Sequence, residues 1–464
     1  MIVNSGSFRD PIGTVYEKDN RVFRKVDNSY REFCNKFLLS NFFQQSKKKL
    51  IVDTKFIEPL DIGFQEDTSS TFWLEHERIK LITYPHEWGF ETLKKAALFH
   101  LELQKKALEA GFIIKDASPY NVQFKMGEPI FIDFLSFGDY KEGSHWVAYN
   151  QFCENFLNPL LIEAYTGVEH NQFFRGSIDG VGAQLTSKML PLSSWLSFKT
   201  ISHVHLAAWA QKKVDATSKS PLKSLKPSIS SRNLVALWES IILFISKLKT
   251  KKKTYWANYE NNTSYNNDSV MEKDRLVGDF VSKNKLHTVV DLGCNSGRYS
   301  RIAFIHGAKR VIGLDVDGGA IDKANLDKEL KAKEFIGLQF DLMNPSPAIG
   351  WRNSERLTLW DRLPNIDGII CLALIHHICI GKNVPIGEFI KLLFSTANNI
   401  LIEFVPKSDP MVKGLLANRL DVFTDYNEKH FENEIVKYGK IHNINYLKDS
   451  TRKLYECHSK NYEK

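Results

Sequence analysis

The sequence predicts two domains of different fold class: an α+β domain in the N-terminal half, and an α/β domain with a doubly wound, mostly parallel sheet in the C-terminal half. With 464 residues, the chain is longer than one hydrophobic core usually serves. Residues 216–232 have the Ser-, Lys- and Pro-rich composition of a linker. Beyond them, apolar strand-like runs alternate with helical patterns, which is typical of strand and crossover-helix units.

The first domain is expected over residues 1–212. Residues 10–90 read as short strands with one helix, and residues 90–111 form an amphipathic pattern that ends at a glycine, as a helix would. A linker and a connecting helix follow over 213–250. The apolar stripe of that helix predicts packing on a domain or, alternatively, contact with a membrane surface.

The second domain is expected over residues 251–464. Its five predicted strands are 287–293, 310–316, 336–342, 367–374 and 399–405. Their apolar runs are those of strands buried on both faces, as in a parallel sheet with helices on each side.

The composition fits an ordinary globular protein, with 43% hydrophobic and 25% charged residues. Part of the net charge of +8 comes from lysine runs at 47–49 and 251–253, which nucleic acid, an anionic membrane or an acidic glycan would attract. A solvated basic surface is the favoured interpretation, because both runs lack the interleaved aromatic residues of single-strand binders. Nucleic acid is therefore not the expected partner.

The cysteines and apolar segments indicate a cytoplasmic protein. The six cysteines are scattered without a Cys-x-x-Cys pair, which favours a reducing compartment over a disulfide framework or zinc site. The N-terminus lacks the basic start and apolar run of a secretory signal. The apolar stretch 234–248 contains Glu239 and is too short for a transmembrane helix. The oligomeric state is not indicated.

Residues 288–304, "TVVDLGCNSGRYSRIAF", predict a strand, a glycine turn and a helix. Gly293 and Gly297 permit the tight turn by which doubly wound folds approach an adenosine ligand. Asp315 and Asp317 follow the next strand, where an acid accepts hydrogen bonds from ribose hydroxyls. Asp341 ends the third strand and is placed for the adenine amino group.

Together, "DLGCNSG", "GLDVD", "FDLMN" and "LALIHHI" resemble the motif series of class I S-adenosylmethionine-dependent methyltransferases, over residues 255–464. The resemblance implies a Rossmann-like fold with S-adenosylmethionine as cofactor. It implies that Asp291, Gly293 and Gly297 surround the methionine part, that Asp315 binds ribose, and that Asp341 binds adenine. The turn departs mildly from the family at Cys294 and Asn295, where Cys-Gly is commoner. The predicted cofactor-binding residues of this domain are Asp291, Gly293, Cys294, Gly297, Asp315, Asp317 and Asp341.

Other candidates in this half leave alternatives open. One of His376 and His377 is either a base that takes the acceptor's proton or a packed core residue. Tyr259 and Tyr265, in an aromatic stretch that also holds Tyr255 and Trp256, either cover the sulfonium methyl group or pack in an ordinary way. Glu403 and Asp409 follow the fifth strand, where acceptor contacts usually gather.

In the N-terminal half, residues 113–137 read "IIKDASPYNVQFKMGEPIFIDFLSF". Phosphoryl transfer to a hydroxyl requires a carboxylate near the acceptor and ligands for magnesium beside the nucleotide phosphates. Asp116 is the candidate for the first role, and Asn121 and Asp133 are the candidate magnesium ligands.

This order of helix, D-x-x-x-x-N and I-D-F resembles the catalytic core of the protein-kinase-like and aminoglycoside-kinase-like superfamily, over about residues 90–140 with a helical lobe to 212. The resemblance implies ATP and Mg²⁺ as ligands, with Lys25 as the phosphate lysine and Glu32 as its helix partner. The usual His-Arg before the aspartate and the usual glycine loops are absent. An active kinase, a silent nucleotide-binding module and an unrelated polar loop remain open.

The whole layout, with "DASPYN", "IDFLSF" and "EFVPKSDPM", resembles bacterial methyltransferases related to the nodulation protein NoeA. The pairing is also similar to bacterial enzymes that phosphorylate and then methylate a surface polysaccharide, although their domain order differs. These resemblances imply a methyltransferase that acts on a glycan or small-molecule acceptor, with a kinase-like domain that is either active or a catalytically silent substrate- or partner-binding module. Nucleic-acid methylation is disfavoured, because the Pro-Pro-Tyr or Pro-Pro-Phe motif of base-amino methyltransferases is absent.

Overall fold

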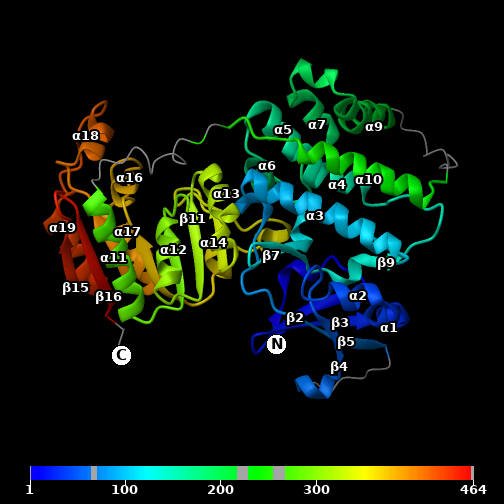
Figure 1. Cartoon of the computed structure of the whole chain (residues 1–464), viewed down its shortest axis with the longest axis horizontal. Helices are drawn as coiled ribbons and strands as arrows, with labels where there is room; N and C mark the ends of the chain where they lie inside the picture. The colour runs from blue at the N-terminus through cyan, green and yellow to red at the C-terminus, as the bar shows by residue number, and fades with distance from the viewer. Residues whose placement is uncertain (1, 64–69, 217–227, 253, 255–266, 461–464) are drawn as a thin grey trace. The chain divides into compact units, whose positions relative to one another are not determined.

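The computed structural model describes residues 2–63, 70–216, 228–252, 254 and 267–460 (Figure 1). The chain forms two compact units. The N-terminal unit comprises Met1–Lys252 and Ser346–Arg362, and the C-terminal unit comprises Lys253–Pro345 and Leu363–Lys464. Among the described residues, no helix is both long and apolar enough to span a bilayer.

The boundaries differ from the predicted ones in two places. Helix α10 (Ser231–Ser246) packs along α3 (Phe90–Glu109) with a buried apolar stripe, as that stripe predicted, and it belongs to the N-terminal unit rather than to a separate linker segment. Residues 346–362 were expected in the second domain, but they also belong to the N-terminal unit. Local sequence patterns predict elements, not the unit on which each element packs.

The N-terminal unit begins with a five-stranded antiparallel sheet of order β1-β2-β3-β5-β4. Its strands are β1 (Ile2–Val3), β2 (Gly13–Lys18), β3 (Arg21–Asp27), β4 (Thr54–Ile57) and β5 (Thr71–His76). Helices α1 (Arg31–Leu39) and α2 (Asn41–Ser46) separate β3 from β4.

After α3, two short strand pairs hold the polar loop of this unit. Strand β6 (Phe112–Ile114) pairs with β9 (Phe137–Asp139), and β7 (Val122–Lys125) pairs with β8 (Glu128–Phe131). The following α-helices are α4 (Tyr149–Phe152), α5 (Asn158–Thr166), α6 (Asn171–Gly176), α7 (Ala183–Met189), α8 (Phe198–Thr200) and α9 (Leu206–Ala216). Two π-helical turns, Cys153–Leu157 and Ile201–His205, continue α4 and α8.

Aromatic packing fixes the polar loop against α1. The ring of Phe37 from α1 lies 4.9 Å from Phe112, 5.2 Å from Phe134 and 4.7 Å from Phe137, measured between ring centroids. All four side chains are buried. Because aromatic pairs at these separations add to the energy of burial, the loop between β8 and β9 is held in one position.

The 346–362 segment contains a 3₁₀ turn (Trp351–Asn353) and α15 (Leu359–Arg362). The guanidinium of Arg362 lies 4.0 Å over the ring of Tyr84 and donates to both carboxylate oxygens of Glu87. Burial raises the pKa of Glu87, but the charges of Arg362 and His86, together with the hydrogen bonds from Arg362, outweigh burial and lower that pKa. Glu87 is fully buried, so this ion pair anchors the segment within the N-terminal unit.

The C-terminal unit is built on a seven-stranded sheet of order β12-β11-β10-β13-β14-β16-β15. Its strands are β10 (Thr288–Leu292), β11 (Arg310–Asp315), β12 (Glu334–Gln339), β13 (Ile366–Cys371), β14 (Ala397–Phe404), β15 (Gly439–Tyr446) and β16 (Lys453–Ser459). The first five neighbours are parallel, and β16 is antiparallel to both β14 and β15. This confirms the predicted mostly parallel sheet and adds a C-terminal antiparallel hairpin that was not expected.

The helices of this unit follow the strands in the alternating order of crossover connections. They are α11 (Asn267–Lys283), α12 (Arg298–Ile305), α13 (Gly318–Leu326), α14 (Lys328–Lys331), α16 (Ile375–Cys379), α17 (Ile386–Thr396), α18 (Pro410–Leu416) and α19 (Glu428–Tyr438). The strand order reverses between β10 and β13, and ligands of such sheets bind beyond the carboxyl ends of the strands at that point.

Candidate functional site

The glycine turn lies at the carboxyl end of β10, where the strand order reverses. The backbone N–H groups of Gly293 and Cys294 donate to the carbonyl of Leu314 on β11, at 2.8 and 3.2 Å. Gly293 and Gly297 have φ angles of +80° and +84°. A Cβ atom on Gly297 would lie 2.5 Å from the side chain of Leu330, so both conformation and space require glycine there. The Cys294 thiol is buried beneath the turn.

Asp315, at the end of β11, ties this turn to the next strand. One carboxylate oxygen accepts from the backbone N–H of Asn295 and the other from that of Asp317, both at 2.9 Å. Burial raises the pKa of Asp315, and these backbone hydrogen bonds oppose the rise. A carboxylate has about four lone-pair directions, so Asp315 keeps acceptor capacity for a ligand's hydroxyl groups.

Asp291 lies beneath the turn and is only 2% exposed. It accepts a hydrogen bond of 2.6 Å from the hydroxyl of Ser300 on α12. Burial raises its pKa to about 7; the bond from Ser300 opposes this rise, and the charge of Asp315 adds to it. The Asp291 carboxyl group is therefore poised between its neutral and charged forms near neutral pH.

The remaining two predicted acids have different local partners. Asp317 is the N-cap of α13 and accepts from the backbone N–H groups of Gly319 and Ala320, so its carboxylate is engaged in the helix start. Asp341 is half-buried beyond β12 and accepts from the backbone N–H of Met343 at 2.9 Å. The strands that Asp315 and Asp341 follow are neighbours in the sheet.

The two histidines lie on α16, just beyond β13. The side chain of Leu374, which precedes this helix, lies 3.7 Å from the position of a Cβ on Gly293, so α16 starts beside the glycine turn. His376 is 1% exposed, and neither of its ring nitrogens has a hydrogen-bond partner. Burial lowers the pKa of His376 to about 3 and also lowers that of the less buried His377, so both rings are neutral at pH 7.

A buried ion cluster that sequence reasoning missed lies at the ends of β13 and β14. Lys273 of α11 contacts Glu403 at 2.8 Å, and Arg452 makes a two-pronged contact with Asp409 at 2.6 and 3.0 Å. Glu403 also accepts from the backbone N–H of Ala373 at 2.8 Å. The acceptor-contact residues predicted after the fifth strand therefore have their carboxylates in ion pairs. The sequence analysis selected the two acids but not their cationic partners, Lys273 and Arg452, which lie far from them in the sequence.

The Ala373 backbone at this cluster is strained, with a φ angle of +51° in a residue other than glycine. Its N–H is held by Glu403, which explains how the conformation persists. The aromatic candidates Tyr259 and Tyr265, with Tyr255 and Trp256, lie outside the described residues.

In the N-terminal unit, the structure brings Asp116 and Asn121 together. The Asn121 amide donates to Asp116 at 3.1 Å, and the Gln151 amide donates to the other carboxylate oxygen at 2.5 Å. Burial and the neighbouring Asp133 carboxylate raise the pKa of Asp116.

Asp133 is held by a cation that the sequence analysis did not select. Arg24 of β3 donates to one carboxylate oxygen at 2.7 Å, and the hydroxyl of Ser136 donates to the other. Burial tends to raise the pKa of Asp133, but Arg24 and Ser136 outweigh it and lower the pKa. Successive side chains of a strand point to opposite faces, so Lys25 lies on the other face of β3 and is not brought to Asp133. The alternation of side chains along β3 is the signal that would have selected Arg24, rather than Lys25, as the partner of Asp133.

No protein-family model matches the chain. The nodulation protein NoeA of Rhizobium meliloti (strain 1021) is 36% identical over 460 residues, which cover 97% of this chain and 95% of NoeA. The chain belongs to the NoeA family.

Solved structures give weaker likenesses. The N-methyltransferase NodS from Bradyrhizobium japonicum WM9 aligns with 42% of this chain and 98% of its own, at 10% identity and a TM-score of 0.32. The bifunctional kinase-methyltransferase WbdD aligns with 47% of this chain and 45% of its own, at 16% identity and a TM-score of 0.30. The strand order, rather than these low scores, identifies the sheet of this NoeA-family member as Rossmann-like.

Proposed function

We propose that this NoeA-family chain is an S-adenosylmethionine-dependent methyltransferase whose methyl-donor site lies beyond β10, β11 and β12. One observation carries the proposal: the glycine turn, Asp315 and Asp341 lie at the carboxyl ends of three adjacent parallel strands. Sheets of this kind bind adenosine ligands beyond those ends.

Each group has a chemical role in this proposal. Asp315 accepts hydrogen bonds from the ribose hydroxyls, and Asp341 accepts one from the adenine amino group. The absence of side chains at Gly293 and Gly297 lets the ligand approach the backbone closely. When Asp291 is ionised, its negative charge beneath the turn favours a cationic ligand.

The cofactor supplies an activated methyl group, and the chain aligns the acceptor with it. A neutral imidazole on α16 takes the acceptor's proton if the acceptor loses one. His377 is the better base, because it is less buried than His376. His376, with its pKa near 3, keeps the wall of the site uncharged.

Titration calorimetry of the purified chain with S-adenosylmethionine tests the donor site. Asp315→Ala and Asp341→Ala should each weaken binding at least tenfold, because each removes a ligand acceptor. Asp327→Ala is a matched control that loses an N-cap carboxylate of α14 in the same unit and should bind as the unchanged chain does. Unchanged binding in both site variants, with their folding verified by circular dichroism, would rule out this site.

The N-terminal unit is a kinase-like module that binds the acceptor and is catalytically silent. Its strand order, the helices between β3 and β4, and the loop with Asp116, Asn121 and Asp133 support the kinase-like assignment. The contact of Arg24 with Asp133 supports silence, because the carboxylate that would bind Mg²⁺ is already paired with a cation. The acceptor is a glycan or another small molecule, and the nodulation role stated in the relative's name is compatible with either.

The alternative is a bifunctional enzyme whose N-terminal unit binds ATP and Mg²⁺ and phosphorylates the acceptor. Calorimetry with ATP and Mg²⁺ distinguishes the two. A silent module gives no heat of binding in the unchanged chain, whereas Arg24→Ala frees Asp133 and gains affinity for Mg²⁺. ATP binding that is magnesium-dependent in the unchanged chain and lost in Asp133→Ala would establish the bifunctional enzyme.

A further inference from the structure

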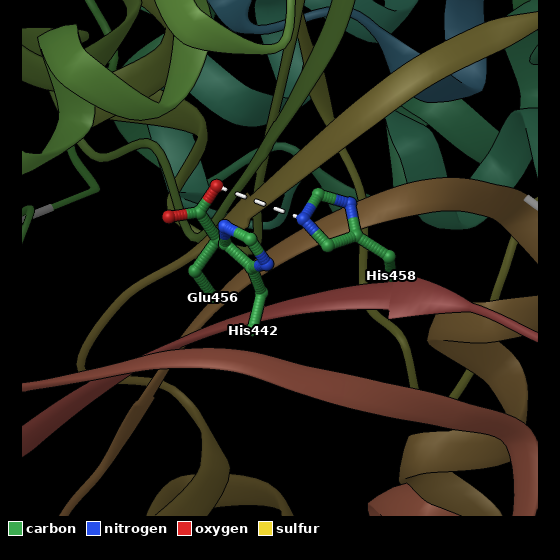
Figure 2. A group of neighbouring side chains, drawn as sticks. All are labelled: His442, Glu456 and His458. Atoms are coloured by element: carbon green, nitrogen blue, oxygen red, sulfur yellow. Dashed lines mark ion pairs between the residues drawn. The ribbon is translucent and has the colours of Figure 1, made fainter. Parts of the chain in front are cut away.

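A bulge in the C-terminal hairpin brings two histidines and a glutamate together. Strand β15 pairs with β16 so that Ile441 faces Cys457 but Asn443 faces Glu456, which leaves His442 as an extra residue. Glu456 and His458 are two positions apart on β16 and so share one face. The bulge turns His442 toward that face, and Figure 2 shows the three side chains converging.

The separations suit a shared ion better than direct hydrogen bonds. One ligand atom from each residue lies within 4.8 Å of the others. Nε2 of His458 is 3.8 Å from Oε1 of Glu456, which is too far for a hydrogen bond. Ligand atoms around a tetrahedral zinc ion are about 3.4 Å apart, given bonds of about 2.1 Å. His442 is exposed, so rotation of its side chain closes the remaining gap.

The protonation of His458 follows from its neighbours. The Asn399 amide nitrogen donates to the carbonyl of Asp367 at 2.7 Å, so the amide oxygen is the atom that faces Nδ1 of His458, at 2.8 Å. That oxygen only accepts, and Nδ1 must therefore carry the proton. In the neutral ring, Nε2 then presents its lone pair toward Glu456, which is the arrangement of a metal-binding histidine fixed by an outer hydrogen bond.

The carboxylate is oriented in the same way. The amide of Asn284, just beyond α11, donates to Oε1 of Glu456 at 2.8 Å. Metal-ligating carboxylates are commonly held by such hydrogen bonds. Both β16 groups are thus positioned by residues outside the hairpin.

We propose that His442, Glu456 and His458 form a binding site for a divalent first-row transition ion, with Zn²⁺ as the ion that best fits the ligands. Two imidazoles and one carboxylate match zinc, whereas Mg²⁺ and Ca²⁺ prefer oxygen ligands alone. Three protein ligands leave one position for water. Because its ligands come from both strands, the bound ion cross-links the bulge of β15 to β16.

The test uses the full chain after dialysis against EDTA, titrated with ZnCl₂ in a calorimeter. One ion should bind per chain, and His442→Ala and Glu456→Gln should each weaken binding at least tenfold. His442→Ala removes an exposed side chain and should fold normally. His430→Ala is the matched control, because His430 lies 3.6 Å from Glu434 in another histidine-glutamate pair of the same unit, and its zinc binding should be unchanged.

Two further readouts separate this site from adventitious binding. Zinc should raise the melting temperature of the unchanged chain and of His430→Ala but not that of His442→Ala. Affinity should fall at least tenfold from pH 7.5 to pH 5.5, because protons compete for the imidazoles. Failure of the unchanged chain to bind zinc, or equal binding in His442→Ala and Glu456→Gln, would overturn the proposal. The six buried cysteines do not compete in the folded chain.

Discussion

Asp291→Asn should make the C-terminal unit more stable at pH 8 and remove a pH dependence that the unchanged chain shows. The Asp291 carboxyl group is buried, and its folded pKa is about 7 against an ordinary value of 3.8. Between these values the folded state holds a proton that the unfolded state has lost. The free energy of unfolding therefore falls as the pH rises from about 4 to about 7.

The magnitude follows from the size of the shift. A difference of about three pKa units corresponds to about 4 kcal/mol, since each unit is worth about 1.4 kcal/mol. Asparagine keeps an oxygen that accepts the hydrogen bond from Ser300 but has no charge to bury. The variant should thus match the unchanged chain near pH 4 and exceed it by up to about 4 kcal/mol at pH 8.

The assay is urea unfolding followed by hydrogen exchange in peptides from β10 and β11, which reports on this unit alone. Ser300→Ala provides a directional check: it removes the bond that lowers the Asp291 pKa, so the fall in stability should extend to higher pH. Asp327→Asn controls for the loss of a carboxylate, because asparagine caps a helix equally well. Equal pH dependence in Asp291→Asn and the unchanged chain would refute the reasoning.

Three further substitutions test backbone strain and buried charge. Gly297→Ala should lower the unfolding free energy of the C-terminal unit by about 2–3 kcal/mol, because alanine is strained at a positive φ angle and its Cβ overlaps Leu330. The measurement is urea unfolding followed in the same peptides. An unchanged midpoint would contradict this prediction. Ala373→Gly should instead stabilise that unit by about 0.5 kcal/mol, because the strain released at a φ angle of +51° exceeds the entropy that glycine adds to the unfolded chain. A lower melting temperature would disprove this prediction. Arg362→Ala should cost the N-terminal unit about 3–5 kcal/mol, because it leaves the Glu87 carboxylate buried without its cation. Tryptophan fluorescence follows this last change, since every tryptophan except Trp256 lies in the ranges of the N-terminal unit; a loss below 1 kcal/mol would show that Glu87 finds another partner.

Much of the C-terminal sheet was predictable, because its five parallel strands are short apolar runs separated by helical patterns. The glycine turn and Asp315 were also predictable in position, since they follow buried strands directly. The hairpin of β15 and β16 was not predicted, because neither strand keeps the alternation that marks a half-buried strand: Ile441 and Ile444 are three positions apart, and Leu454 and Tyr455 are adjacent. The bulge at His442 depends on pairing register, which local sequence does not specify.

Long-range partners explain the other differences. Arg24 rather than its neighbour reaches Asp133, and only the phase of β3 in the folded sheet decides between them. The ion pairs of Glu403 and Asp409 join residues that lie far apart in the sequence. Charged residues give no periodic signal of their partners, so a single sequence could suggest the acids but not the network.

The placement of the 346–362 segment has a consequence for synthesis of the chain on the ribosome. Glu87 is translated long before Arg362, so during most of translation its carboxylate has no cation to accompany it into the core. The first unit can therefore be completed only after about half of the second, Lys253–Pro345, has emerged, and the usual order in which an N-terminal domain folds first does not hold here. A stop codon after residue 252 would release a fragment in which the buried Glu87 carboxylate lacks its cation. A gene fragment that starts at residue 253 would encode the 346–362 segment without the N-terminal residues on which it packs.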